Sequence, residues 1–325
     1  MWLILLFVVI IGLCIGSFLN VVILRTISNE SIVFPASKCP KCQHPLKWWH
    51  NIPVLSYIIL RGKCDFCKER ISIQYPIIEI LTSLVFTVAF LKFGFSLDTL
   101  FAWIIGSLFI ILAGTDWKEQ VVYDRHTYTL IGTGLLYAIL STAIALFNDY
   151  TLLGELHFTT EWFVINPITV SLLGIICGFI IMELISRIGY LIAGERAFGE
   201  GDSFILAGLG AIFGWRMLLP ILILSVITQI MITLPIYMKK EYDRKNWMTL
   251  IAIGVFCFYA ISFVMAYNFG WLSNNIAYIS SAIVMAILGV LACREVLRGI
   301  REPENRTYLP FGPALLFAGM IFLLV

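Results

Sequence analysis

The chain has 325 residues, of which 60% are hydrophobic and only 13% are charged. A soluble globular domain carries about 25% charged residues, so this composition excludes an ordinary soluble protein. The net charge of +2 gives no strong basic bias, and we expect no nucleic-acid partner. The apolar runs are long and continuous rather than alternating, which predicts membrane helices in lipid and not a β-barrel.

Ten apolar runs approach the length of about 17 to 25 residues that crosses a bilayer as a helix. In chain order they lie at 2–24, 75–95, 99–115, 128–147, 166–186, 203–218, 219–238, 247–268, 275–293 and 309–325. The first run starts without a basic n-region and ends in Asn20 and Arg25 rather than in a small-residue cleavage site, which favours a retained span over a signal peptide. We therefore predict an all-α polytopic membrane protein of about ten transmembrane helices.

The distribution of Lys and Arg predicts the orientation of these spans. With the N-terminus outside, the cytoplasmic segments are 25–74, 116–127, 187–202, 239–246 and 294–308. All of the 22 basic residues except Lys92 and Arg216 then lie on the cytoplasmic side, as the positive-inside rule requires. The segment 26–74 is too long and too polar to be a simple connection, and we interpret it as a small cytoplasmic domain.

This cytoplasmic domain contains two CxxC pairs, Cys39-Pro-Lys-Cys42 and Cys64-Asp-Phe-Cys67, with 21 residues between them. Two such pairs are typical of a tetrahedral Cys₄ zinc site. A disulfide reading is weaker because the cytoplasm is reducing. Four thiolates leave no open coordination position, so we predict a structural Zn²⁺ held by Cys39, Cys42, Cys64 and Cys67.

Three aspartates lie at the predicted membrane border. Asp116 and Asp124 follow the third span, and Asp202 begins the sixth, within Gly199-Glu-Gly-Asp202. Paired carboxyl groups can hydrolyse a peptide when one is ionised and the other protonated. Eight residues on one continuous helix correspond to roughly 12 Å of rise, so Asp116 and Asp124 could not pair with each other there and one of them must meet Asp202.

The glycines beside Asp202 have two possible explanations. Gly199 and Gly201 would allow unusual backbone angles and the close approach of a peptide. Alternatively, they form a simple turn in which Asp202 caps the start of a helix. Glu79, inside the second apolar run, is similarly either functional or a hydrogen-bonded polar residue between helices.

Several motifs along the chain together resemble the bacterial type IV prepilin leader peptidase and N-methyltransferase family of GxGD intramembrane aspartyl proteases. Besides the cysteine pairs and the aspartate motifs, they are Gly16–Val22 with Arg25, Trp48–Pro53, Leu60–Cys64, Tyr75–Glu79, Leu206–Gly210 and Leu309–Pro313. The match covers about residues 10–235 and 300–325, and the motifs agree in both type and order.

The resemblance implies an aspartyl endopeptidase of the bacterial cytoplasmic (inner) membrane. Its active site would face the cytoplasm and remove the leader peptide of type IV pilin-like precursors. Asp116 and Asp202 would be catalytic, with Asp124, Gly199 and Gly201 supporting them.

The resemblance also implies a second activity, N-methylation of the new N-terminus by S-adenosylmethionine. Glu79 is the main polar candidate for that site, and Ser17 and Asn20 are weaker candidates. Membrane lipid and the pilin-like precursors are the expected partners.

The chain departs from the family pattern at three places. Tyr123 replaces the usual Pro before the second aspartate, and Phe204 replaces the usual Lys after the GxGD motif. Residues 247–293 have no counterpart and would form an inserted pair of spans. The expected domains are a first helix, the zinc-binding domain, the protease core, the insertion, and a cytoplasmic segment with the last helix, at 1–25, 26–74, 75–238, 247–293 and 294–325.

Two other functions fit part of the pattern. A presenilin or signal-peptide-peptidase type of protease shares the Tyr123-Asp124 and GxGD pair, but the cysteine pairs and the Gly16–Val22 motif argue against it. A non-enzymatic transporter or metal-handling protein would place carboxylates along a path near the membrane midplane. The three aspartates instead gather at one face, which favours a protease at the membrane border.

Overall fold

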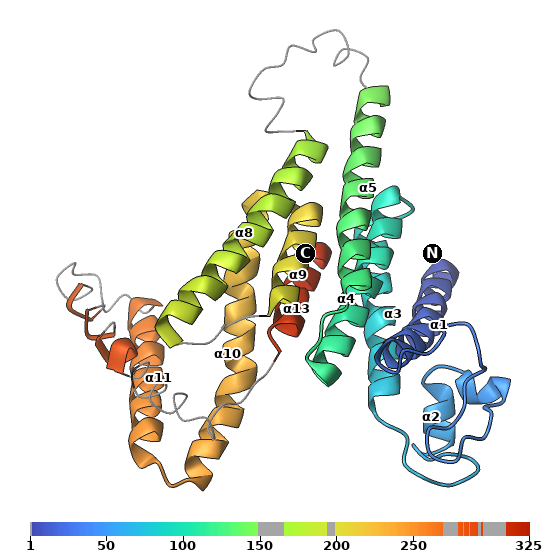
Figure 1. Cartoon of the computed structure of the whole chain (residues 1–325), viewed down its shortest axis with the longest axis horizontal. Helices are drawn as coiled ribbons and strands as arrows, with labels where there is room; N and C mark the ends of the chain where they lie inside the picture. Colours follow the sequence, from blue (N-terminus) through green and yellow to red (C-terminus); the bar gives the residue numbers. More distant parts are fainter. Residues whose placement is uncertain are drawn as a thin grey trace. The chain divides into compact units, whose positions relative to one another are not determined.

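The computed structural model describes residues 2–148, 166–193, 199–268 and 310–325, with shorter pieces at 279–281, 283–285, 287–291 and 294. These residues form helices and loops with two isolated β-bridges. Six helical segments among them are long and apolar enough to cross a membrane. The predicted all-α, multi-pass membrane fold is confirmed, with the small cysteine-bearing domain between the first two of these helices (Figure 1).

Among the described residues, helices lie at nine of the ten predicted spans, so the count of ten is approximate. The long helices are α1 (Trp2–Ile27), α3 (Gln74–Phe93), α4 (Leu97–Glu119), α5 (Asp124–Asn148), α8 (Pro167–Ala193), α10 (Leu218–Asp243) and α11 (Trp247–Asn268). Two shorter ones are α9 (Glu200–Phe213) and α13 (Gly312–Leu324). The predicted span 275–293 is described only in pieces, and most of the predicted cytoplasmic segment 294–308 lies outside the described residues.

Two breaks in the helical structure differ from the sequence expectation. The helix α4 ends at Glu119, because Gln120 adopts the left-handed conformation with φ +55°, and α5 begins at Asp124. Asp116 and Asp124 therefore do not share a continuous helix, and the helical-distance argument does not apply to them. The predicted span 203–218 is also divided, because α9 ends before Gly214, whose φ of +74° favours glycine.

The described chain divides into two compact units. The first comprises residues 1–228 and 310–325, so the last helix returns to the unit in which the chain began. The second comprises residues 229–309, a range that includes the whole predicted insertion 247–293. A core of fully buried side chains in the first unit joins α4, α5, α9 and α13, and includes Phe109, Leu112, Leu130, Ile205, Leu206, Leu209 and Leu315.

Small residues allow the helices of the first unit to approach closely, as is common in membranes. On α1, a Cβ at Gly12 would lie 2.5 Å from the Cα of Ser83, and a Cβ at Gly16 would lie 2.6 Å from the Cα of Glu79. Both contacts are with the backbone of α3, which cannot move aside easily. This packing fixes the polar residues that follow Gly16 on α1 against the start of α3.

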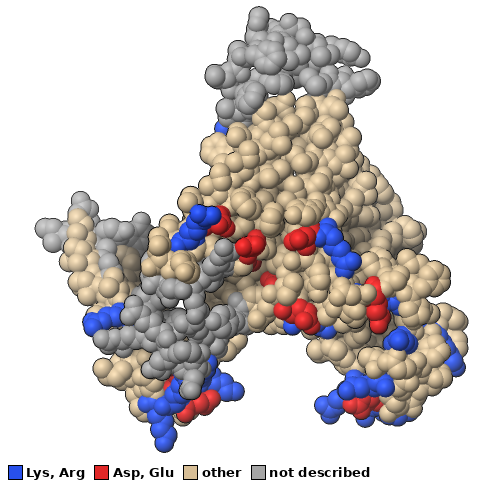
Figure 2. Space-filling view, viewed as in Figure 1, with Lys and Arg blue, Asp and Glu red and all other residues tan. Residues whose placement is uncertain are grey.

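The ends of the helices that the sequence assigns to the cytoplasm meet at one end of the first unit. The side chain of Thr26 at the end of α1 forms a hydrogen bond with that of His126 at the start of α5, with 3.1 Å between Oγ1 and Nε2. Gly201 at the start of α9 contacts Val122 in the α4–α5 connection. Figure 2 shows charged side chains gathered toward this end of the unit, and a broad uncharged surface along the rest of its helices.

Candidate active site and metal centre

The two CxxC pairs form two turns of the same construction. In the first, the amide of Cys39 donates to the carbonyl of His44 and the amide of Gln43 donates to that of Cys39, at 3.0 and 2.9 Å. The second repeats this pattern between Cys64, Lys68 and Glu69. An isolated β-bridge closes each turn, and both Gln43 and Lys68 have positive φ. Each turn therefore directs two sulfur atoms to one side.

The four sulfur atoms of Cys39, Cys42, Cys64 and Cys67 lie within 4.8 Å of one another. Four thiolates bound to a tetrahedral ion with bonds near 2.3 Å would be about 3.8 Å apart, so the arrangement can hold a metal ion. The backbone amide of Cys67 points at the Cys64 thiol and lowers its pKa to about 7 against the opposing effect of burial. This favours the thiolate form of Cys64, whereas, against the opposing effect of the Glu69 amide, burial and the neighbouring thiols raise the pKa of Cys67 to about 11.

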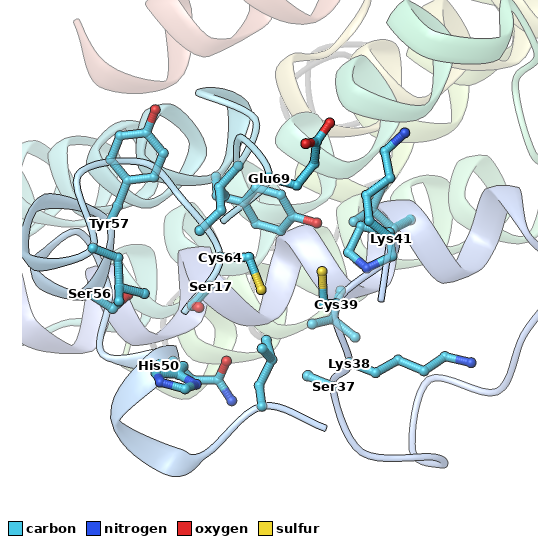
Figure 3. Close-up of a pocket in the computed structure, with 18 of the residues that line it drawn as sticks. Ser17, Ser37, Lys38, Cys39, Lys41, His50, Ser56, Tyr57, Cys64 and Glu69 are labelled. Carbon is cyan, nitrogen blue, oxygen red and sulfur yellow. The ribbon is translucent and has the colours of Figure 1, made fainter. Parts of the chain in front are cut away.

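A cavity of about 380 Å³ lies between this domain and the membrane helices. Its wall combines Cys39 and Cys64 with Tyr57, Tyr75 and the acidic side chain of Glu79. In Figure 3 the sulfur atoms of Cys39 and Cys64 point toward the same space, and Ser17 lies on the helix behind them. The cavity falls within the roughly 300–1,000 Å³ of ordinary ligand sites.

The three residues predicted for a methyl-transfer site lie on the neighbouring faces of α1 and α3. Glu79 is buried, and its Oε2 accepts a hydrogen bond of 2.7 Å from the amide of Val54. Ser17 approaches the same carboxyl group and lines the cavity with it. Asn20 does not line the cavity, and its side-chain amide donates to the carbonyl of Tyr75 at 3.1 Å. Asn20 thus connects the two helices.

Asp116 and Asp202 form a second polar site in the first unit. Asp116 is 3% exposed in the last turn of α4, and Asp202 is 8% exposed in the first turn of α9. They lie close enough for their charges to repel each other. The Oδ2 of Asp202 accepts a hydrogen bond of 3.2 Å from the amide of Gly199. The first residue of the Gly-Glu-Gly-Asp motif therefore holds the carboxyl group of the last one in place.

Gly201 positions this motif against the neighbouring chain. Its Cα lies so near Val122 that a Cβ would overlap the Val122 side chain, in the connection between α4 and α5. Any larger residue at position 201 would force this turn and Val122 apart. Asp124 differs from both aspartates because it is exposed, at the first residue of α5.

Sequence reasoning missed two contacts between helix ends of the first unit. Gly312, at the start of α13, lies directly against the carboxyl group of Asp116. Gly312 belongs to the Leu309–Pro313 motif, which carried part of the family resemblance. Nothing in the sequence connected that motif with Asp116. The buried pair of Thr26 and His126 likewise joins segments that are 100 residues apart. Phe204, which replaces the usual Lys, packs with Tyr128 and Phe179.

These features define a multi-pass membrane protein with two buried carboxyl groups at its helix ends and a separate cluster of four cysteines that could hold a metal ion. The family model described as "Bacterial Peptidase A24 N-terminal domain" matches residues 10–93, and that described as "Type IV leader peptidase family" matches residues 103–234. The chain belongs to the type IV leader peptidase family.

Three similar proteins carry the name prepilin leader peptidase/N-methyltransferase. The protein from Myxococcus xanthus is 33% identical over 67% of this chain and 59% of its own length. Those from Neisseria gonorrhoeae and Klebsiella pneumoniae are 32% and 31% identical over 66% of this chain, and over 75% and 87% of their own lengths. No solved structure shows a significant similarity to this chain.

Proposed function

We propose that this chain is an intramembrane aspartyl endopeptidase that removes the leader peptide from type IV pilin-like precursors. The observation that supports it is that two buried carboxyl groups, Asp116 and Asp202, come from different helices and lie close enough for their charges to repel each other. Two such neighbours cannot both ionise easily, so they share a proton. One carboxylate can then activate water while the other carboxyl group protonates the peptide carbonyl.

The position of the pair suits a substrate that is itself half in the membrane. Both aspartates lie at helix ends that the distribution of Lys and Arg assigns to the cytoplasmic face of the inner membrane. A precursor whose cleavage site directly precedes a hydrophobic helix would present its peptide bond at this depth. Lipid surrounds the helices, and no nucleic acid takes part.

The second proposed activity is N-methylation of the new N-terminus by S-adenosylmethionine. That cofactor supplies a methyl group on a positively charged sulfonium centre. The cavity beside the metal site fits such a group because Glu79 provides a negative charge and Tyr57 and Tyr75 provide aromatic faces. Ser17, beside Glu79, would help to position the amine.

One assay tests both activities. The purified protein in lipid is incubated with a pilin-like precursor, with and without S-adenosylmethionine. The masses of the products are then measured by mass spectrometry. We expect leader removal in both reactions and an additional methyl group only when the methyl donor is present. An intact precursor in both reactions would refute the peptidase, whereas an unmethylated product under all conditions would refute only the second activity.

We further propose that the four-cysteine site holds one structural Zn²⁺. The protein is then expected to contain near-stoichiometric zinc under reducing conditions. Replacing Cys64 and Cys67 together with Ser should remove the metal and unfold residues 26–74, because the binding free energy of such sites is largely their folding free energy. Elemental analysis and limited proteolysis measure these two effects.

The matched control for the zinc experiment replaces Cys14 and Cys177, which lie on α1 and α8 away from the cluster. This variant should keep its zinc. Retention of zinc by the Cys64 and Cys67 double variant would contradict the assignment.

The inserted segment 247–293 is proposed to be dispensable for cleavage. It contains no Asp, Glu, His, Lys or Arg, and the family match ends at residue 234. Joining residue 246 to residue 294 removes two spans and keeps the sidedness of the last helix, so cleavage should persist. The same excision in an Asp202→Asn background gives the inactive baseline. Complete loss of cleavage in a correctly inserted protein would show that the segment belongs to the site.

A further inference from the structure

The start of the last helix touches the Asp116 carboxyl group. Gly312 is buried at the first residue of α13, in direct contact with the Oδ2 of Asp116. A Cβ built on Gly312 would overlap that oxygen and would also lie 3.1 Å from the Cδ1 of Ile205. Only glycine therefore lets the last helix approach Asp116 this closely.

The hydrogen bonds at the start of α13 leave one amide facing Asp116. The amides of Ala314 and Leu315 both donate to the carbonyl of Phe311, at 3.0 and 3.1 Å. Pro313 has no N–H. The amide of Gly312, in the first turn where no intrahelical acceptor exists, faces the carboxyl group of Asp116. The Oδ2 of Asp116 is fully buried and has no hydrogen-bond partner among the described residues.

We propose that Gly312 is a positioning residue for the peptidase, and that the last helix completes the carboxyl site. The close approach that glycine permits holds the Asp116 carboxyl group in the orientation that faces Asp202. This inference rests on the proposed function of Asp116 and Asp202 as the hydrolytic pair. It also assigns α13 a role in catalysis although its start lies almost 200 residues beyond Asp116 in the chain.

The first test is the kinetics of Gly312→Ala. The added methyl group would turn the carboxyl group away from its partner, and a displacement of this size lowers rates by about 10²-fold. We expect that loss in kcat, with KM changed by less than a few-fold because the pilin-like precursor still binds. The matched control is Gly319→Ala on the same helix, which would press on the side chains of Leu209 and Phe109 but on no carboxyl group.

The kinetic outcomes separate the positioning role from general packing. A Gly312→Ala enzyme with unchanged kcat overturns the proposal, and so does an equal loss of kcat in Gly319→Ala. Asp116→Asn, measured in parallel, distinguishes failure of the proposed function. If that variant still cleaves, the peptidase assignment of Asp116 fails, whereas an inactive Asp116→Asn with a fully active Gly312→Ala refutes only the role of Gly312.

A second measurement applies if Gly312→Ala folds poorly. Thermal unfolding is followed for Gly312→Ala both in the natural sequence and in an Asp116→Ala background, as a double-mutant cycle. Because the overlap is mainly with the Asp116 side chain, the fall in Tm should be smaller when that side chain is absent. An equal fall in both backgrounds would show that the contact with Asp116 is not what position 312 requires.

Discussion

Replacing either Asp116 or Asp202 with Asn is expected to abolish leader cleavage in correctly inserted protein. Asn keeps the shape of each side chain and removes the ionisable group. Because the proposed mechanism requires the two carboxyl groups to share a proton and act as one unit, each single replacement should lower kcat by about 10³-fold or more, and the double replacement should lower it little further. Cleavage of a pilin-like precursor, measured by gel shift and product mass, gives the rates.

Asp124→Asn is the matched control for this prediction. Asp124 is exposed at the start of α5, whereas Asp116 and Asp202 are buried. An acidic residue in the first turn of a helix is favourable for the helix dipole, typically by about 0.3–1 kcal/mol. Asp124→Asn should therefore keep measurable activity. If Asp116→Asn still cleaves and Asp124→Asn does not, the assignment is reversed and the presenilin type of site becomes the better description.

The choice between Asp116 and Asp124 shows where sequence reasoning reached its limit. Eight residues of continuous helix would have separated the two carboxyl groups by geometry alone. Gln120 instead turns the chain in the left-handed conformation, so their separation is decided by tertiary packing. Burial then distinguishes them, because Asp116 is covered by α13 and Asp124 is not.

The membrane helices and the gathering of the four cysteines could be predicted because their signals are local. Each span is a continuous apolar run whose length must match the bilayer, and each CxxC pair directs two sulfur atoms to the same side within one turn. The cavity and the contact of Gly312 with Asp116 could not be predicted in this way. Both depend on segments far apart in the chain, and no periodicity in the sequence encodes which helix ends meet.

The second large effect is expected at Glu79, which should be needed for methylation and not for cleavage. Glu79 lines the cavity beside the four-cysteine cluster, on a different helix from Asp116 and Asp202. An amine must lose its proton before it can accept a methyl group, and a buried carboxylate beside it can take that proton. Glu79→Gln should therefore lower the methylation rate by about 10²- to 10⁴-fold, with cleavage and zinc content unchanged.

Glu79 also has a structural contact, and the choice of substitution separates the two roles. Its Oε2 accepts the hydrogen bond from Val54, a residue with φ +61° that needs support from its surroundings. Gln keeps an oxygen that can accept this bond, whereas Ala removes it. We expect Glu79→Gln to lose methylation while its thermal unfolding remains close to that of the natural protein, and Glu79→Ala to lose both methylation and stability. Normal methylation by Glu79→Gln, measured on a precursor that has already been cleaved, would show that the charge is not required and that Glu79 serves only to hold the turn at Val54.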